Sequence, residues 1–313
     1  DGEPEPLESK TLDEDSSLRI NLLGFIYTAS KFSATSYEKI IKFFSQTFAA
    51  YQLSDDSILE KKISKQLEKL KEYGMITDEN GFKPTKFGIR VFYLRIDPET
   101  AFNMTGYVED YVRGTKHTFG ILHMITNLPE FYLRYPIPEK YQEDMDDLIN
   151  KNEKLYTQQK FSSEDCFKSL LILYKWIDAM TYQNMSEHFD AEPGDIFYIK
   201  ENAKDLVYTF TEIVKFWRDY AQENEQKKIV SEYQNLIDES DLLKLQIIHG
   251  VPEKYLELVK IRQIGRVRAQ ILYKNGYKNR TILKKIPLEK LAAIDKIGMT
   301  LAKSIKSQVE KVR

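Results

Sequence analysis

The sequence predicts a mainly α-helical protein built from three successive parts. Apolar residues recur at helical spacing along most of the 313 residues, and capping residues precede many of these runs. An Asn-Gly pair, Asn80 and Gly81, separates two short apolar stretches and predicts a small β-hairpin. Near the C-terminus, one pattern of apolar residues and glycine occurs twice, 33 residues apart, which predicts a supersecondary unit used twice.

The first part has the element order of a winged helix. Residues 1–17 are acidic and contain proline, so we expect a linker or strap there. Three amphipathic helices, the hairpin and a further helix follow, which predicts a winged-helix domain over residues 18–98. The residues that suit the helix ends are Ser16 or Ser17, Thr35 with Glu38, Gly74, and Thr85.

The second part, residues 99–240, is predicted to be a helical bundle. Asp97 followed by Pro98 suits a helix start, because Asp caps the first turn and Pro fits the first helical position. The helices expected in this part are Glu164–Met180, one that begins at Gly194 and Asp195 and extends to Phe210, and Val214–Tyr220, with breaks at Asn127–Pro129, Tyr135–Pro138 and Ala191–Asp195.

The third part, residues 241–313, holds the repeat and the positive charge. From Val251 to Arg313 there are 16 Lys and Arg residues against 5 Asp and Glu, although the whole chain has a net charge of −2. A basic segment on an acidic chain favours a polyanionic partner; a solvated lysine-rich surface is the alternative. The matched residues are Leu258 with Leu291, Ile261 with Ile294, Ile264 with Ile297, Gly265 with Gly298, Ala269 with Ala302, and Leu272 with Ile305.

Each copy of the repeat consists of a short helix, an Ile-Gly pair and a second helix, which is the helix-hairpin-helix pattern. We expect a positive φ at the glycine, close approach of another backbone, and an anion bound by the amides that follow. Such a unit holds DNA phosphates without selecting bases. The candidate DNA contacts here are Arg262, Gly265, Arg266, Val267, Arg268, Lys274, Gly298 and Thr300. The second copy lacks the two arginines after its glycine, so we expect it to be mainly structural; a plain helical hairpin remains the alternative.

No catalytic site is predicted. The sequence has no phosphate-binding loop of the G-x-x-x-x-G-K-[ST] type, and its four histidines lack metal-ligand spacing. Cys166 is the only cysteine, which excludes an internal disulfide. Because no apolar run is long enough to span a membrane and no signal peptide is recognised, we expect a cytoplasmic protein with no membrane partner. Since the sequence has no nucleotide-binding or metal-binding motif, we expect no cofactor in this chain.

Several stretches together resemble the C-terminal half of archaeal Hjm-type DNA repair helicases and their animal relatives, the HELQ helicases. The stretches that carry the resemblance are Gly2–Lys10, Pro84–Ala101, Gly120–Ile125, Lys175–Ile177, Glu192–Ile196 and His249–Tyr277, of which the last is the most specific. The resemblance covers nearly the whole chain. It implies the same order of winged helix, helical (ratchet) bundle and helix-hairpin-helix domain.

The resemblance also implies a superfamily-two motor that uses ATP to unwind DNA 3′ to 5′ at forked or stalled-replication structures. A chain that starts at Asp1 would then be the accessory half, without the RecA-like motor domains that bind ATP and Mg. Its expected partners are single-stranded and forked DNA and its own motor domains. The winged helix would pack on the motor through residues such as Phe43 or Tyr51. We expect a nucleoid-associated monomer without ATPase activity of its own.

Two positions of the ratchet helix depart from the family pattern. In the family, the ratchet helix offers an Arg to a phosphate and a Trp to a base seven residues later, but here Tyr198 and Asp205 occupy those positions. Tyr198 can still stack on a base, whereas Asp205 would repel a phosphate. We therefore add Tyr198, Lys200 and Lys204 to the candidate DNA contacts.

Two alternative functions remain open. The chain would also suit a free-standing DNA-binding or adaptor protein that has this architecture without a motor. It would equally suit an RNA-directed relative of the spliceosomal helicases, which combine a helical bundle with a helix-hairpin-helix.

Overall fold

The computed structural model describes residues 14–53, 55–113, 118–131, 141, 143–144, 146–147 and 167–310. Several predictions fall outside these residues: most of the strap over 1–17, the stretch Gly2–Lys10, His117, the break at Tyr135–Pro138, Cys166, and the first residues of the helix expected from Glu164. Within the described part the chain is mainly α-helical, as predicted.

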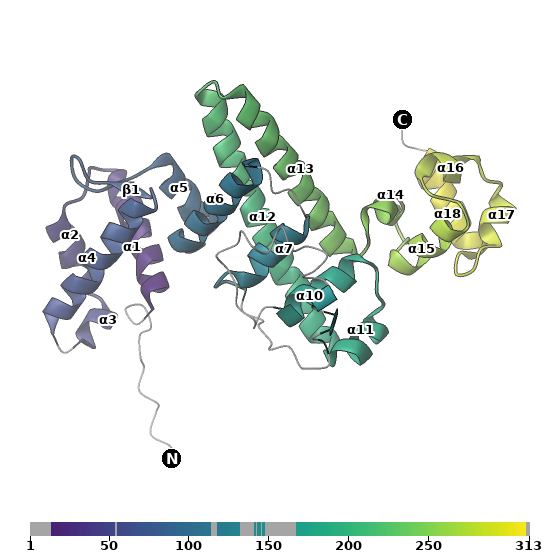
Figure 1. Cartoon of the computed structure of the whole chain (residues 1–313), viewed down its shortest axis with the longest axis horizontal. Helices are drawn as coiled ribbons and strands as arrows, with labels where there is room; N and C mark the ends of the chain where they lie inside the picture. Colours follow the sequence, from purple (N-terminus) through teal and green to yellow (C-terminus); the bar gives the residue numbers. More distant parts are fainter. Residues whose placement is uncertain are drawn as a thin grey trace, which may run out of the picture. The chain divides into compact units, whose positions relative to one another are not determined.

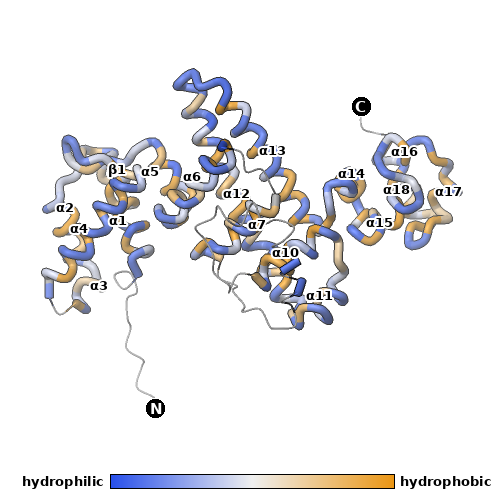
Figure 2. The backbone as a smooth tube through the Cα atoms, in the orientation of Figure 1, coloured by the Kyte–Doolittle hydropathy of each residue, from blue (hydrophilic) through white to orange (hydrophobic). Residues whose placement is uncertain are grey.

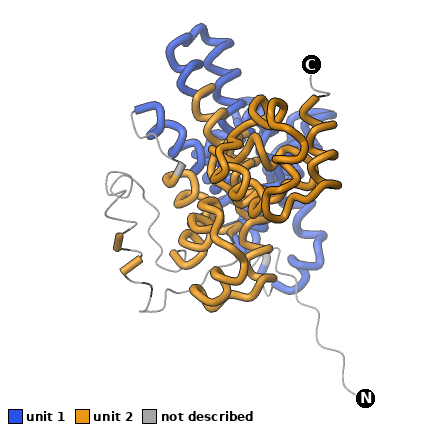
Figure 3. Tube along the Cα trace, turned by 90° about the vertical axis from the view of Figure 1, so that its right-hand side faces the viewer, with its two compact units in different colours: residues 1–113, 212–233 blue, residues 114–211, 234–313 orange. Residues whose placement is uncertain are grey.

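By its contacts the chain divides into two compact units, coloured separately in Figure 3. Unit 1 contains Asp1–Arg113 and Glu212–Tyr233, and unit 2 contains Gly114–Thr211 and Gln234–Arg313. The long helices α12 (Pro193–Glu223) and α13 (Lys227–His249) contribute residues to both units. The helix expected over Val214–Tyr220 is therefore not separate: it is the last part of α12, because no helix-breaking residue precedes it. The turn between α12 and α13 is hydrophilic, as Figure 2 shows.

The elements of unit 1 before α12 are α1 (Asp15–Ser30), α2 (Tyr37–Phe44), α3 (Phe48–Tyr51), α4 (Asp56–Glu72), β1 (Ile76–Thr77), β2 (Lys83–Pro84), α5 (Lys86–Leu94) and α6 (Pro98–Val112) (Figure 1). The predicted hairpin is confirmed: β1 pairs antiparallel with β2, Ile76 lies opposite Pro84, and Gly81 has a φ of 86°. Whether these elements adopt a winged-helix arrangement remains a prediction.

The helix caps of unit 1 agree with the sequence in most cases. Thr85 accepts a hydrogen bond from the Gly88 amide, Asp97 caps α6 with Pro98 at its start, and Gly74 follows α4 with a φ of 70°. Two predicted caps are wrong. The cap of α2 is Ser36, because the neighbouring Thr35 is buried and forms a β-bridge with Phe82. Helix α1 starts at Asp15, before the expected serines, and has no side-chain cap.

A buried ionic network fastens the start of α6 to α1. Arg19 is only 3% exposed, and its Nε and Nη2 donate to the two carboxylate oxygens of Asp97 at 2.9 and 2.6 Å. The remaining Nη1 donates to the Gln66 side-chain oxygen at 3.0 Å, so α4 joins the network. A buried charge is tolerated only when it is paired in this way. The Asp97 carboxylate therefore serves as a helix cap and as a counter-ion.

Unit 2 begins with helices of the predicted bundle and ends with short helices that contain the repeat. Its further elements are α7 (Thr118–Asn127), α10 (Phe167–Ile177), α11 (Tyr182–Phe189), η3 (Glu253–Tyr255), α14 (Leu256–Val259), α15 (Arg266–Lys274), α16 (Arg280–Lys285), α17 (Leu288–Ala292) and α18 (Gly298–Glu310). Both copies of the repeat contribute to one hydrophobic core, in which Leu258, Ala269 and Ala302 are fully buried. The fold buries every matched apolar position except Ile294, which is partly buried and packs against the same core.

Candidate nucleic-acid interface

The two copies of the repeat have the same order of elements. In the first, α14 ends at Val259, a turn follows, and Gly265 is the N-cap of α15. In the second, α17 ends at Ala292 and α18 begins at Gly298. Each copy therefore places its glycine where a turn enters the longer helix, as the sequence predicted.

The positive φ was expected at the glycine of each copy, and this is wrong for the first. Gly265 is extended, with φ −85° and ψ −179°, whereas Gly298 has a φ of 60°. In both copies the residue two positions before the glycine is left-handed: Gln263 has a φ of 71° and Lys296 a φ of 60°. These two residues are 33 positions apart, so the turn itself is repeated. The left-handed step comes two residues before the glycine, and Gly265 is not required for it.

Gly265 instead leaves space in front of a helix N-terminus. A Cβ at this position would meet no atom within 4 Å, so within the described chain no backbone makes the close approach that we expected. No side chain caps α15, and the first hydrogen bond into it runs from the Ala269 amide to the Gly265 carbonyl. The amides of its first turn thus face an open position, which is the arrangement that favours an anion.

Arg262 lies in the turn just before this position. Its backbone is held by Gln308 of α18, which accepts from the Arg262 amide at 2.8 Å and donates to the Arg262 carbonyl at 3.3 Å. Its side chain is exposed and makes no hydrogen bond or ion pair with any residue that the structure describes. The guanidinium is therefore available to a phosphate while its backbone stays fixed.

Arg266 occupies a different environment. Its guanidinium carbon lies 4.2 Å from the centroid of the Trp176 ring and 4.9 Å from that of Tyr182, so it contacts both rings, whose own centroids are 5.0 Å apart. Burial lowers the pKa of Arg266 below its ordinary value, and the Nη1 atom is inaccessible to solvent. Packing of this kind joins α15 to α10 and α11, and it turns part of the guanidinium away from any external partner.

Arg268 is committed to backbone carbonyls. Its Nε donates to the Lys296 carbonyl and its Nη1 to the Gln263 carbonyl, both at 2.9 Å. The other sequence-predicted contacts of this segment, Val267, Lys274, Gly298 and Thr300, are exposed. Of the three arginines predicted as phosphate contacts, Arg262 alone keeps its side chain unengaged among the described residues.

The predicted contacts on α12 are nearly neutralised by acidic neighbours. Lys204 pairs with Glu201 and with Asp205, and the hydrogen bond that Lys204 donates to Glu201 raises the pKa of Lys204. Lys200 lies over the Phe197 and Trp176 rings, at 4.9 and 5.6 Å, and also pairs with Glu201. Tyr198 is 56% exposed and therefore open to stacking.

Lys200 and Arg266, which were predicted from two separate segments, meet at the ring of Trp176. The sequence prediction missed Trp176 and Tyr182 as members of this cluster, and it missed Gln308 as the residue that holds Arg262. Trp176 was noticed only as part of a short family landmark. The sequence around a single tryptophan does not predict that two cations from distant segments will contact its ring.

The described residues contain no group of three or more His, Cys, Asp or Glu side chains placed to hold a metal ion. Among the same residues, no helix is both long and apolar enough to cross a membrane. Neither observation adds a site to the one around Gly265.

Comparison with known proteins identifies the class first. The family model described as "Archaeal helicase, domain 4" matches residues 119–234, which include α7, α10, α11 and α12. The class of this segment is therefore a helical domain of archaeal helicases.

Curated relatives then identify the family. The chain is 30% identical to the ATP-dependent DNA helicase Hel308 of Pyrococcus abyssi and 31% identical to that of Pyrococcus horikoshii, in each case over 97% of this chain and 41% of the relative. It is 27% identical to Hel308 of Thermoplasma volcanium over 88% of this chain and 36% of the relative. The chain belongs to the Hel308 family, and it spans about two fifths of the length of the curated relatives that it matches.

Proposed function

We propose that this chain is the DNA-binding accessory region of an ATP-dependent, 3′-to-5′ helicase that acts on forked or stalled-replication DNA. The observation that carries the proposal is the open helix N-terminus at Gly265 beside the unengaged guanidinium of Arg262. The relatives bear the name of DNA helicases, and the C-terminal segment around this site is strongly basic.

The chemistry of this position suits a phosphodiester. Backbone amides at a helix N-terminus supply directional donors and a partial positive charge, and a guanidinium adds a charge-assisted hydrogen bond. Neither group distinguishes one base from another, so binding would follow the backbone of the strand. Exposed Tyr198 on α12 offers a surface on which a base can stack without sequence preference.

The variant Gly265→Val tests the proposal directly. Because Gly265 has an extended backbone and empty space around its Cβ position, valine fits the folded chain. Its methyl groups would instead fill the position that the phosphate needs. We expect thermal stability close to that of the parent and at least a tenfold weaker affinity for labelled forked and single-stranded DNA.

Gly106→Val is the matched control, because Gly106 lies in α6 of unit 1 and a Cβ there also meets nothing within 4 Å. This control should bind DNA as the parent does. Equal affinity of Gly265→Val and parent at several salt concentrations would refute the phosphate site. Stronger competition by a matched RNA fork than by DNA would favour the RNA-directed alternative.

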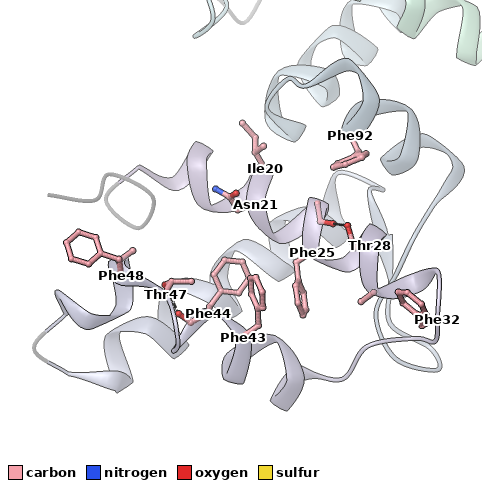
Figure 4. Close-up of a pocket in the computed structure, with 13 residues that line it drawn as sticks. Ile20, Asn21, Phe25, Thr28, Phe32, Phe43, Phe44, Thr47, Phe48 and Phe92 are labelled. Atoms are coloured by element: carbon pink, nitrogen blue, oxygen red, sulfur yellow. Dashed lines mark hydrogen bonds between the residues drawn. The ribbon is translucent and has the colours of Figure 1, made fainter. Parts of the chain in front are cut away.

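The proposed motor partner has a candidate docking surface in unit 1. An apolar cavity of about 780 Å³ lies between α1, α2, α3 and α5, and several aromatic residues line it, with Phe48 and Phe32 at opposite ends (Figure 4). Phe32 is 90% exposed and Phe43 is 49% exposed. Exposed aromatic side chains gathered around an apolar cavity suit an interaction site. Since the relatives are more than twice as long as this chain, we propose that the motor part of a Hel308-type helicase covers this cavity.

Phe32→Asp combined with Phe43→Asp tests the docking proposal. Phe32 is largely exposed and Phe43 is half-exposed with its ring stacked on that of Phe25, so the double variant should stay folded with a small loss of thermal stability and bind DNA with the same affinity. It should fail to associate with the separately produced motor part of a Hel308-type helicase in sedimentation experiments. The parent chain alone should hydrolyse no ATP, and DNA-stimulated turnover by pure material would contradict the accessory role.

A further inference from the structure

We propose that Arg268 is a positioning residue, which binds the turn of the first repeat to the turn of the second and so holds Arg262 and Gly265 ready for a phosphate. The effect of Arg268 on DNA binding rests on the proposed function. The contacts that Arg268 makes belong to the folded chain alone.

The evidence is a symmetric pair of hydrogen bonds. Arg268 donates to the carbonyls of Gln263 and Lys296, each at 2.9 Å. These acceptors are the left-handed residues of the two turns, and they occupy equivalent positions of the 33-residue repeat. A left-handed residue that is not glycine is strained, so each turn needs outside contacts to hold it. One guanidinium supplies such a contact to both turns at once.

A second link between the copies acts on the neighbouring residue. Gln308, on α18 of the second copy, binds both the amide and the carbonyl of Arg262. Arg268 therefore extends from the first copy to the second, and Gln308 extends back. Together they fix the backbone on both sides of Gln263, just before the open N-terminus of α15.

This geometry gives Arg268 a different role from that of Arg262. The Nε and Nη1 donors of Arg268 are already satisfied by carbonyls, and its planar fork matches two acceptors that a lysine cannot reach together. These bonds engage two of its five N–H groups, so a bidentate phosphate contact through Nε would require Arg268 to release the Lys296 carbonyl. The second copy of the repeat thus supports the site through its Lys296 carbonyl, while the first copy binds the ligand.

The experiment separates charge from geometry. We compare Arg268→Ala, Arg268→Lys and Arg262→Ala for forked-DNA affinity across a salt series and for amide hydrogen exchange of residues 260–268 without DNA. Each phosphate neutralised by a side chain contributes about 0.7 to 0.9 to the slope of log affinity against log salt concentration. Arg262→Ala should therefore flatten the slope by about that amount and leave the exchange unchanged.

Both Arg268 variants should give the opposite result. They should weaken binding about equally at every salt concentration, leave the slope as in the parent, and speed exchange in the turn at least tenfold. Gln308→Ala, which leaves every arginine in place, should behave in the same way. If Arg268→Ala does not fold, Gln308→Ala still tests whether loosening the turn weakens binding without changing the salt slope.

The inference is overturned if Arg268→Ala flattens the slope as Arg262→Ala does, if Arg268→Lys restores parental affinity, or if exchange in the turn does not change. A parent chain that binds no DNA would contradict the proposed function alone. In that case the exchange measurement, which needs no DNA, still decides whether Arg268 holds the turn.

Discussion

The guanidinium carbon of Arg266 lies 4.2 Å from the centre of the Trp176 ring, and this stacked pair connects the basic repeat segment to the helices that precede it. The same indole donates from Nε1 to the Ile247 carbonyl at 2.7 Å. Gln270 adds a hydrogen bond to the Ala179 carbonyl at 3.1 Å. Trp176 therefore joins α10, the end of α13 and the start of α15 within unit 2.

Arg266→Ala should destabilise unit 2. The substitution removes a desolvated cation–π contact, which contributes about 2 kcal/mol when the cation is buried. We expect the free energy of unfolding in urea to fall by about 1 to 3 kcal/mol. Lys274→Ala on the same helix is the control, because Lys274 is exposed, and its effect should stay within about 0.5 kcal/mol. Equal stability of the two variants would contradict the stacking role.

Gly250→Ala should be more damaging than its backbone conformation alone explains. Gly250 has a φ of 61°, and a Cβ there would come within 2.6 Å of the Trp176 ring. Gly276 has a similar φ of 86° but open space around its Cβ position, so Gly276→Ala reports the backbone strain by itself. We expect about 1 kcal/mol for Gly276→Ala and a further 1 to 3 kcal/mol for Gly250→Ala. Differential scanning calorimetry of both variants measures this difference.

The Arg19 network makes a prediction for unit 1. Arg19→Met would leave the Asp97 carboxylate, which is 3% exposed, without its main partner. Breaking a buried ion pair on one side typically costs about 3 to 5 kcal/mol. Lys65→Ala removes the exposed ion pair with Asp15, and should cost less than about 1 kcal/mol. Comparable urea midpoints for these two variants would show that the buried network contributes little.

His249 predicts a pH dependence of stability. Burial lowers the pKa of His249 below its ordinary value of 6.5, and the charge of Lys260 lowers it further. Between the folded and unfolded pKa values the unfolded chain binds more protons, so stability falls as pH decreases below about 6.5. The stability that is lost on protonation of His249 is fully present when the pH is above the pKa of this residue in the unfolded chain. His249→Gln should therefore lose less stability than the parent between pH 7.5 and pH 5.5, as measured by urea unfolding at each pH.

Much of the local structure was predictable from short-range sequence rules. The hairpin at Gly81 and the caps at Thr85 and Asp97 depend on backbone preferences of a few adjacent residues, and all three were predicted. The cap of α2 was misplaced by one residue because Thr35 forms a bridge with Phe82, which is distant in sequence. Long-range pairing of this kind overrides a local capping preference.

The position of the candidate site was predictable from the sequence, but the different roles of its three arginines were not. The repeat located Gly265 and its arginines, because apolar residues at equivalent positions must fill one shared core. The sequence treated Arg262, Arg266 and Arg268 alike, since all three are basic and adjacent to the glycine. Their different roles depend on partners at Gln308, Trp176 and Lys296, which no local pattern indicates.

The sequence by itself determined the helical class, the hairpin, the doubled unit and the concentration of positive charge near the C-terminus, because these follow from composition, periodicity and local backbone preference. Only the tertiary structure decided which arginine stays unengaged and that Lys200 and Arg266 share the ring of Trp176. Those outcomes depend on which distant side chains compete for the same donors and the same buried space.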